Sequence, residues 1–451
     1  MHYSKKIHNA QKRHTRKIYP RHSKIHGNIS KKEGWIILHI YGNPYERGFA
    51  HGKLLCHEIK KLEKAFPFIV ETQLKQSFSD YLKACKTVIN PIVKKDYPEF
   101  YEEIKGIADG CSSTGHKINV DYLIAWNAVF SMYLYFKKKD AYKCSAFIAT
   151  GDATEKGTIV MGHNTHADFV TGQYQNIILY ITPDEGFPFV MQTAPGYIAS
   201  GIDWFICSTG IIGCETTISL INYEVNFGAP YFCRIRQAMQ YGKTLDDYVS
   251  IMLKNNAGDY ACSWLFGNIN TNEIMLFDIG LKEHHIERTH NGVYFGMNTA
   301  IDFKFRSLET TDTDLYNLET SSGSRNSRLD HLLNEVYYGK INRDNGKKIL
   351  SDHYDSSLGK NVMNSRSICK HSELEYRERS RLSYYPFGCT DGKVVDSTMA
   401  KRMKFEGRFG SSCGRVFNAS EHIKKHPEYK KWEGILEDLP KRKWITIHGD
   451  S

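Results

Sequence analysis

A change of hydrophobic period near residue 143 constrains the fold more than any other feature of the sequence. Between about residues 45 and 136, apolar side chains such as Ile59, Leu62 and Phe66 recur at three-to-four spacing, which is typical of amphipathic helices. From Cys144 onward, short apolar runs are divided by Gly, Pro, Asn and Asp, which is typical of strands joined by turns. This order predicts an α+β fold in which helices pack against a many-stranded sheet.

The first two predicted strands after this change form a β-hairpin. Residues 145–150 and 158–161 are apolar or β-branched, and the segment between them has turn chemistry. The hairpin places Cys144 at the head of the first strand, and His163 and Asn164 at the end of the second. We therefore expect a thiol and polar side chains at the same end of a sheet.

Other segments extend the pattern over the rest of the chain. Further strands are predicted at residues 34–40, 177–181, 187–192, 197–206, 210–221, 264–269, 274–278 and 293–298, with Thr271 and Asn272 as a hairpin turn, and helical spacing returns at residues 231–254 and 324–338. No repeat or low-complexity block interrupts residues 33–451. We expect one domain, made of a helical front segment at 33–143 and a sheet-rich core at 144–451.

Gly106 and Gly110 lie four apart within the helical pattern. Two interpretations are open at this point. Either the two glycines allow close backbone packing of one helix on another, or a helix ends at Gly110.

The net charge of +10 is carried entirely by the N-terminus. Residues 1–32 contain ten Lys and Arg and no Asp or Glu, so the other fifty basic residues balance the fifty acidic ones. We interpret residues 1–32 as a disordered, solvated tail. Such a tail either lacks a dedicated ligand or contacts a polyanion electrostatically.

Targeting and redox signals are sparse. The tail lacks an apolar signal region and no run of ~18 apolar residues occurs, so neither secretion nor an integral membrane span is expected. The eleven cysteines are odd in number, scattered and without a C-x-x-C pair, which favours a cytoplasmic or other reducing compartment. The basic, acid-free tail leaves organelle targeting open as an alternative.

No cofactor or metal is expected from the motifs. The sequence has neither a phosphate-binding loop nor a dinucleotide fingerprint. The segment Glu283-His284-His285-Ile286-Glu287 lacks the i, i+4 histidines of a helical zinc site. The glycine-rich segment from Gly410 to Gly414 follows no predicted strand and is interpreted as a loop.

Five ordered motifs resemble the landmarks of two related families. They are Gly34-Trp35-Ile36-Ile37-Leu38-His39-Ile40, the segments 44–52 and 103–110, Cys144-Ser145-Ala146-Phe147 and Gly162-His163-Asn164-Thr165. In this order they resemble the isopenicillin N acyltransferase-type and phospholipase B-like families, both of which are N-terminal nucleophile hydrolases. The resemblance covers roughly residues 34–448.

The resemblance implies a four-layer αββα sandwich, made as an inactive precursor and cleaved between Lys143 and Cys144. Elementary chemistry agrees with this scheme. A thiol with a pKa near 8.5 is mostly protonated at neutral pH, whereas a terminal amine with a pKa of about 7.7–8.0 can accept its proton. Cleavage would create that amine, and the Cys144 thiol could then attack an amide or ester carbonyl to give a thioester.

The same resemblance suggests further catalytic residues. Asn298 is the first candidate for a donor to the tetrahedral oxyanion and Asn256 the second, with backbone N–H groups as the remaining alternative. His163 matches a site histidine of the phospholipase B-like proteins, and His166 stands where those proteins have Trp. Asp168 is a candidate for orienting the new amine.

Substrate binding is assigned to three side chains: Thr217, His166 and Arg325. The segment Glu215-Thr216-Thr217 resembles another site segment of these families, with Thr217 as a candidate for a polar pocket wall. Arg325 and Arg328 are three apart and share a helix face, so one of them could hold a substrate carboxylate or the strand ends, although surface arginines are the commoner case.

The predicted function is therefore that of an autoprocessed cysteine hydrolase or acyltransferase. Its substrate would be a small-molecule acyl amide or a (lyso)phospholipid. A phospholipase B-like lipid deacylase and a non-catalytic binding protein on the same fold are the alternatives. Two chains rather than one on a denaturing gel would distinguish the enzyme from the binding protein.

Overall fold

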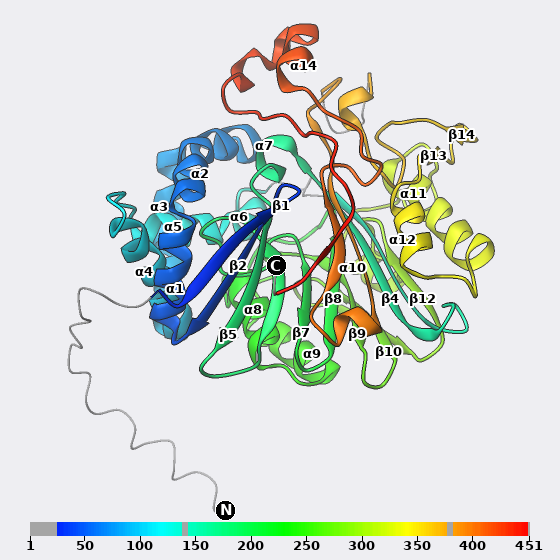
Figure 1. The fold of residues 1–451 in the computed structure, drawn as a ribbon. Helices are drawn as coiled ribbons and strands as arrows, with labels where there is room; N and C mark the ends of the chain where they lie inside the picture. Colours follow the sequence, from blue (N-terminus) through cyan, green and yellow to red (C-terminus); the bar gives the residue numbers. More distant parts are fainter. Residues whose placement is uncertain (1–24, 138–142, 377–381, 450–451) are drawn as a thin grey trace, which may run out of the picture.

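The computed structural model describes residues 25–137, 143–376 and 382–449, which form two facing β-sheets (Figure 1). The nine-stranded sheet has the order β1 (Gly27–Lys32), β2 (Trp35–Gly42), β5 (Ile177–Pro183), β6 (Phe189–Thr193), β7 (Trp204–Cys207), β8 (Ile211–Thr217), β9 (Cys262–Asn268), β10 (Glu273–Ile279), β11 (His284–Thr289). The six-stranded sheet has the order β12 (Gly292–Gly296), β3 (Lys143–Gly151), β4 (Gly157–Asp168), β15 (Phe387–Asp396), β16 (Phe405–Phe409), β17 (Ile445–Ile447). Strands β2 and β5 run parallel, and the pairs on either side of them are antiparallel.

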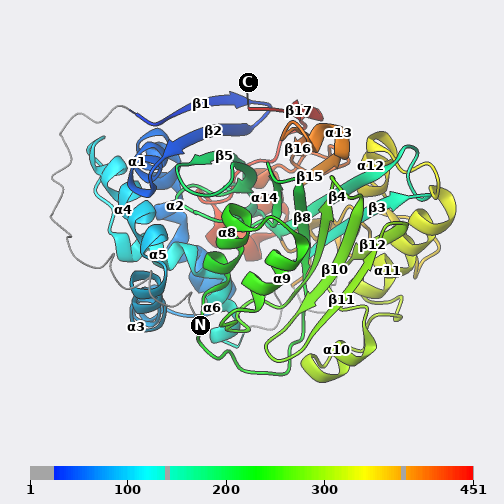
Figure 2. The ribbon, with the colours of Figure 1, turned by 90° about the horizontal axis from the view of Figure 1, so that it is seen from below.

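Helices cover the outer face of each sheet (Figures 1 and 2). The nine-stranded sheet is covered by α1 (Pro44–Leu54), α2 (Cys56–Ile69), α3 (Phe78–Asp96), α4 (Pro98–Ser112), α5 (Val120–Asn127), α6 (Val129–Tyr135), α8 (Tyr231–Tyr241) and α9 (Leu245–Leu253). The six-stranded sheet is covered by α11 (Ser321–His331) and α12 (Arg343–Leu350). This layer order confirms the predicted α+β, four-layer αββα sandwich.

Shorter elements complete the described chain. They are α7 (Phe169–Gly172), α10 (Phe303–Glu309), α13 (Ser397–Ala400), α14 (Ala419–Lys425), the single-turn helices η1 (Val70–Leu74), η2 (Leu332–Val336), η3 (Ser372–Leu374) and η4 (Pro427–Trp432), and the ribbon of β13 (Tyr354–Asp355) with β14 (Lys360–Asn361). Among the helices described, none is both long and apolar enough to cross a membrane.

Side-chain alternation along the strands builds a core on both faces of the six-stranded sheet. Ile148 and Met161 lie in the layer between the sheets, with Leu265 of β9. Phe147 faces the other way and packs in a cluster with Leu329 of α11. Both faces of the strand are therefore apolar, because each is buried against another layer.

The predicted hairpin at the head of the core is confirmed. Strands β3 and β4 pair antiparallel, with Cys144 opposite Thr165 and Ala146 opposite His163. Gly151 and Gly157 flank the turn and both have positive φ (61° and 66°), a backbone conformation that glycine adopts without strain.

The two glycines of α4 allow a close helix crossing, so the first of the two open interpretations is correct. Helix α4 continues past Gly110 to Ser112, and it crosses α1, which brings Gly48 and Gly52. A Cβ at Gly52 would lie 2.0 Å from the carbonyl oxygen of Ile107, and one at Gly110 would lie 2.3 Å from that of Phe49. The two backbones are thus in direct contact.

The predicted N-terminal tail is wrong at its C-terminal boundary. Gly27–Lys32 form β1, the edge strand of the nine-stranded sheet, paired with β2. Glu33 and Gly34 both have positive φ (47° and 83°), as a two-residue hairpin turn requires. The strand was missed because its sequence is basic and has no apolar alternation. It is stabilised by pairing with β2. The rest of the tail, residues 1–24, lies outside the described residues.

Some predicted boundaries also differ. The helical pattern at 231–254 is two helices, because Gly242 ends α8 and Thr244 caps α9 through a reciprocal capping box with Asp247. The strands predicted at 197–206 and 210–221 are shorter, and are β7 and β8. The turn at Thr271 and Asn272 is confirmed between β9 and β10.

Gly52→Ala tests the helix crossing. In an open helix interior this change stabilises by up to about 1 kcal/mol. Here the added methyl meets backbone, so we expect a loss of about 1–3 kcal/mol in the free energy of unfolding, measured by urea titration. Lys105→Ala, at a partly exposed position of α4, is the control. A stabilised Gly52→Ala variant would contradict the packing.

Candidate functional site

Cys144 lies at the start of β3, with 4% of its surface exposed. Alternation along β3 places its side chain on the face that also carries Ala146 and Ile148, between the two sheets. Its cross-strand neighbour on that face is Thr165 of β4. The thiol is thus held at one end of the sandwich, in a protein interior.

Asn298 holds the backbone nitrogen of Cys144 and bridges the two sheets. It follows β12, which pairs with β3, and has a φ of +82°, a conformation that Asn tolerates better than most residues. Its Oδ1 accepts a hydrogen bond of 3.0 Å from the Cys144 N–H, and its Nδ2 donates one of 3.0 Å to the carbonyl of Thr217. The side chain therefore links the six-stranded sheet to the end of β8.

Arg325 holds the other side of the Cys144 peptide. Its guanidinium is fully buried and donates to the carbonyl of Cys144, to the carbonyl of Met297 (2.7 Å) and to Oδ1 of Asn298 (2.9 Å). Of the predicted alternatives for this arginine, holding the strand ends agrees with these contacts, and a surface position does not. Arg328, by contrast, pairs with Asp352 at 2.7 Å.

A buried carboxyl pair lies near the thiol. The Tyr260 hydroxyl is 3.0 Å from a carboxylate oxygen of Asp203 and 3.0 Å from one of Glu215. Tyr231 also donates to Asp203, and Thr217 contacts Tyr260 at 2.9 Å. Burial raises the pKa of Asp203 to about 6, and burial together with the neighbouring Asp203 raises the pKa of Glu215 well above its usual value.

These groups disfavour the thiolate of Cys144. Burial raises the pKa of the thiol well above its ordinary value, and Glu215 and Asp203 raise it further whenever either carboxyl group is ionised. The N–H of His166 and the charge of Lys393 act in the opposite direction. Within this environment the thiol is a weak nucleophile unless a nearby group takes its proton.

His163 shares the face of Cys144 between the sheets. Its Nε2 lies 3.0 Å from the carbonyl of Glu215, while its Nδ1 has no hydrogen-bond partner among the described residues. Burial, with the charge of Lys393, lowers the pKa of His163 well below its usual value, so the imidazole is neutral near pH 7. A neutral ring with one unpaired nitrogen can form a hydrogen bond with a bound molecule.

A second polar network on the same face was not predicted. The Lys393 amine donates to Thr165 (2.9 Å), to Gln192 (2.6 Å) and to Asp391. Gln192 donates in turn to Asp391 at 2.8 Å. Because Thr165 lies opposite Cys144, this network fixes the positions of the side chains beside the thiol. Asp391 and Lys393 lie on β15, which was not predicted from the sequence, in a polar stretch that carries no motif.

The other predicted site residues are His166, Asp168 and Asn256. His166 lies on the opposite face of β4, where its Nε2 is 3.0 Å from the carbonyl of Ile368. Asp168 follows two positions further, and alternation puts it on the same side as His166. Asn256 caps its own loop, because Oδ1 accepts from Gly258 (2.9 Å) and Nδ2 donates to Gly280 (2.6 Å). The contacts of Asn256 thus do not favour its predicted role, and the role of Asp168 stays a prediction.

Comparison with known proteins gives distant likenesses. No protein-family model matches the chain. An uncharacterized protein of Archaeoglobus fulgidus is 28% identical over 250 residues, which are 52% of this chain and only 41% of that protein. The match thus spans about two-fifths of the relative's length.

Among solved structures, the chain is similar to penicillin V acylase from Agrobacterium tumefaciens, with a TM-score of 0.35 and 11% identity over 58% of this chain and 82% of the acylase. It is also similar to a mutant of conjugated bile acid hydrolase from Clostridium perfringens, with a TM-score of 0.32 and 11% identity over 59% of this chain and 89% of the hydrolase. Overlaps of this extent do not define a reaction for the chain.

Glu215→Gln tests the buried carboxyl pair. Because the pKa values of Glu215 and Asp203 are raised on folding, the folded chain keeps protons that the unfolded chain releases above about pH 4. Wild-type stability therefore falls as pH rises from about 4 through the folded pKa values. Glutamine removes this loss at one site, so the variant should gain up to about 1.4 kcal/mol per pH unit relative to wild type in that window.

Urea unfolding at about pH 4.5, 6 and 7.5 measures the difference. Glu319→Gln, at an exposed position, is the control. A difference between Glu215→Gln and wild type that does not change with pH would contradict the assignment of a protonated, buried carboxyl.

Proposed function

We propose that this chain is a cysteine hydrolase of the N-terminal nucleophile type, which cleaves its own Lys143–Cys144 bond and then uses Cys144 to cleave an acyl amide. The observation that carries the proposal is the fixation of Cys144 on both sides. Asn298 accepts from its nitrogen at 3.0 Å, and Arg325 donates to its carbonyl. These contacts would hold the Cys144 nitrogen in place while the bond before it is cleaved, and afterwards when it acts as an amine.

Self-cleavage begins with the thiol of Cys144 attacking the carbonyl carbon of Lys143. The C–N bond between the two residues breaks, the nitrogen takes a proton and becomes an amine, and a thioester remains on the sulfur. Water then hydrolyses the thioester, which releases the carboxylate of Lys143 and restores the thiol. Only 4% of Cys144 is exposed in the uncut chain, so the two new ends must separate before a substrate can reach the sulfur.

Turnover uses the new amine as the base. With a pKa of about 7.7–8.0 the amine can take the thiol proton, and the sulfur attacks the substrate carbonyl. The proton passes to the leaving amine, and water resolves the acyl-thioester. Asn298 Oδ1 already accepts from this nitrogen, so we assign Asn298 to positioning the base. This replaces its predicted role as oxyanion donor, since its Nδ2 is engaged by Thr217.

A cavity lined by residues at the end of α6 and in the segment that follows β8 is our candidate for the acyl group. It has a volume of about 440 Å³, and Leu134, Tyr223 and Phe227 contribute to its walls. Residue 221, which also lines it, follows Thr217 by four positions, and the carbonyl of Thr217 accepts from Asn298. The walls also include the Lys137–Glu224 ion pair, so they suit a mainly apolar acyl chain or ring that carries a polar group.

Cleavage is tested by the intact mass of the purified protein. We expect wild type to yield two fragments, residues 1–143 and 144–451, that stay together under native conditions, because β2 from the first fragment pairs with β5 from the second. Cys144→Ala should remain one chain. Cys262→Ala is the matched control, since Cys262 is buried near the same carboxylates and should leave cleavage intact. A wild-type chain that stays uncut over long incubation at several pH values would overturn the proposal.

Asn298→Ala tests the positioning of the base. Loss of the acceptor leaves the amine free to rotate, so we expect kcat of the processed enzyme to fall by about 100-fold on an acyl-amide panel, with little change in KM. Asn256→Ala is the matched control and should keep full activity. Normal turnover by Asn298→Ala, or equal losses in both variants, would contradict the assignment. Activity on lysophospholipids alone would redefine the substrate as an ester.

A further inference from the structure

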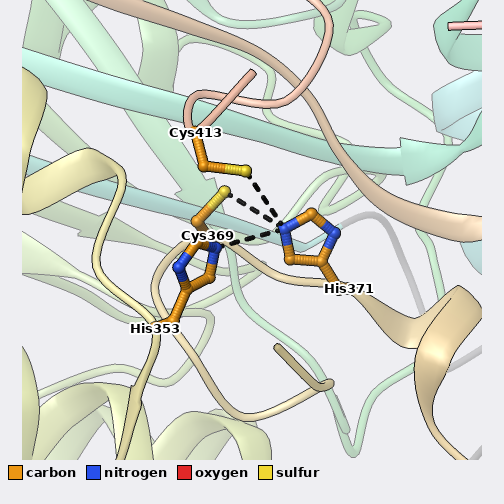
Figure 3. A group of neighbouring side chains, drawn as sticks. All are labelled: His353, Cys369, His371 and Cys413. Atoms are coloured by element: carbon orange, nitrogen blue, oxygen red, sulfur yellow. Dashed lines mark hydrogen bonds between the residues drawn. The ribbon is translucent and has the colours of Figure 1, made fainter. Parts of the chain in front are cut away.

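Four side chains with metal-binding chemistry converge outside the Cys144 contacts (Figure 3). They come from three segments: His353 precedes β13, Cys369 and His371 precede η3, and Cys413 lies in the loop after β16. One potential ligand atom from each residue lies within 4.8 Å of the corresponding atoms of the other three. Cys369 and His371 are fully or almost fully buried, at 0% and 2% exposure.

The contacts within this group have the dimensions of a tetrahedral metal site. The Nε2 atom of His371 lies 3.3 Å from Nε2 of His353, 3.5 Å from Sγ of Cys369 and 3.5 Å from Sγ of Cys413. One ring nitrogen makes a single in-plane hydrogen bond, so it cannot satisfy three neighbours in this way. In tetrahedral zinc with bonds of ~2.05 Å to nitrogen and ~2.3 Å to sulfur, two nitrogens are ~3.3 Å apart, and nitrogen and sulfur are ~3.6 Å apart.

We propose that His353, Cys369, His371 and Cys413 bind one Zn²⁺ ion. Two thiolates and two imidazoles are the donor set that favours tetrahedral zinc over the hard cations Mg²⁺ and Ca²⁺. Four protein ligands leave no open position for water or substrate. The site is therefore structural, and it is separate from the chemistry proposed at Cys144.

A buried carboxylate completes the arrangement. Glu373 accepts a hydrogen bond of 2.8 Å from Nδ1 of His371, and only 5% of Glu373 is exposed. This contact places the proton on Nδ1 and leaves the Nε2 lone pair directed at the group. Carboxylates in this position orient histidine ligands in metal sites, and their loss typically weakens metal binding by about 10- to 100-fold.

The site also ties together the segments that support β4. The carbonyl of Ile368, next to Cys369, accepts from Asn164 at 3.2 Å and lies 3.0 Å from His166 Nε2. Ser412, next to Cys413, donates to Oδ1 of Asn164. A metal at this point would thus hold two loops against the face of β4 opposite to Cys144.

The proposal is tested first on the full-length wild-type chain, without any variant. Elemental analysis of protein purified without chelator should give about one zinc per chain, and X-ray absorption at the zinc edge should show two sulfur and two nitrogen neighbours. Less than about 0.1 metal per chain after addition of Zn²⁺ would overturn the proposal, as would an intact mass that reveals a disulfide between Cys369 and Cys413.

Variants then assign the ligands. Cys413→Ser and His371→Ala should lose most of the zinc, whereas Glu373→Gln should keep it with an affinity lower by about 10- to 100-fold. Cys389→Ser tests the neighbouring thiol, which is buried and contacts both Cys369 and Ser412 but does not belong to the group of four, so this variant should keep its zinc. Retention of zinc by Cys413→Ser, or its loss from Cys389→Ser alone, would contradict the ligand set.

Cys144→Ala separates this proposal from the proposed enzyme activity. That variant should bind zinc at the wild-type level, because Cys144 is not among the four ligands. If the zinc content fell with Cys144→Ala and not with Cys413→Ser, the metal would depend on Cys144 rather than on the proposed ligands, and the inference would be refuted.

Discussion

The candidate site depends on the hydrogen bonds by which Asn298 and Arg325 hold the Cys144 peptide. Burying a guanidinium costs several kcal/mol unless its donors are satisfied, and here they bind the carbonyls of Cys144 and Met297 and the amide oxygen of Asn298. Each partner sits at a different strand end or helix, so the start of β3, the end of β12 and α11 require one another. The same contacts bring the end of β8 into place, because Asn298 also donates to Thr217.

The electrostatics around Cys144 suit a thiol that attacks separate substrates only after self-cleavage has made a base. Burial and the carboxyl groups of Glu215 and Asp203 raise the pKa of the thiol, and the buried His163 is neutral near pH 7 because its pKa is lowered. In the proposed mechanism, cleavage converts the amide nitrogen of Cys144 into an amine that already faces Asn298. The arrangement would then restrict turnover of separate substrates to the processed chain, since the uncut chain lacks that base.

Much of this architecture could be predicted from local sequence, and the parts that could not are tertiary. The change of period at residue 143 and the turn between residues 151 and 157 predicted the hairpin and the layered fold correctly. The burial of Arg325 could not be predicted from its surface-like helical segment. The same holds for the zinc ligands proposed here: Cys369 and His371 are close in sequence, but His353 and Cys413 join them only through the packing of three loops.

The polar side chains on the two faces of β4 give a physical reason for a structural metal site in the proposed hydrolase. One face carries His163 and Thr165 beside the thiol, and the other carries Asn164 and His166, which contact the loops that bear the proposed ligands. Polar side chains buried on both faces leave this strand with less apolar packing at its C-terminal end than in its first half. Hydrogen bonds to two loops compensate only if those loops are themselves fixed. A closed Zn²⁺ site would fix them with three bonds, and with a fourth to His353, and so would stabilise the strand opposite Cys144 without entering the chemistry.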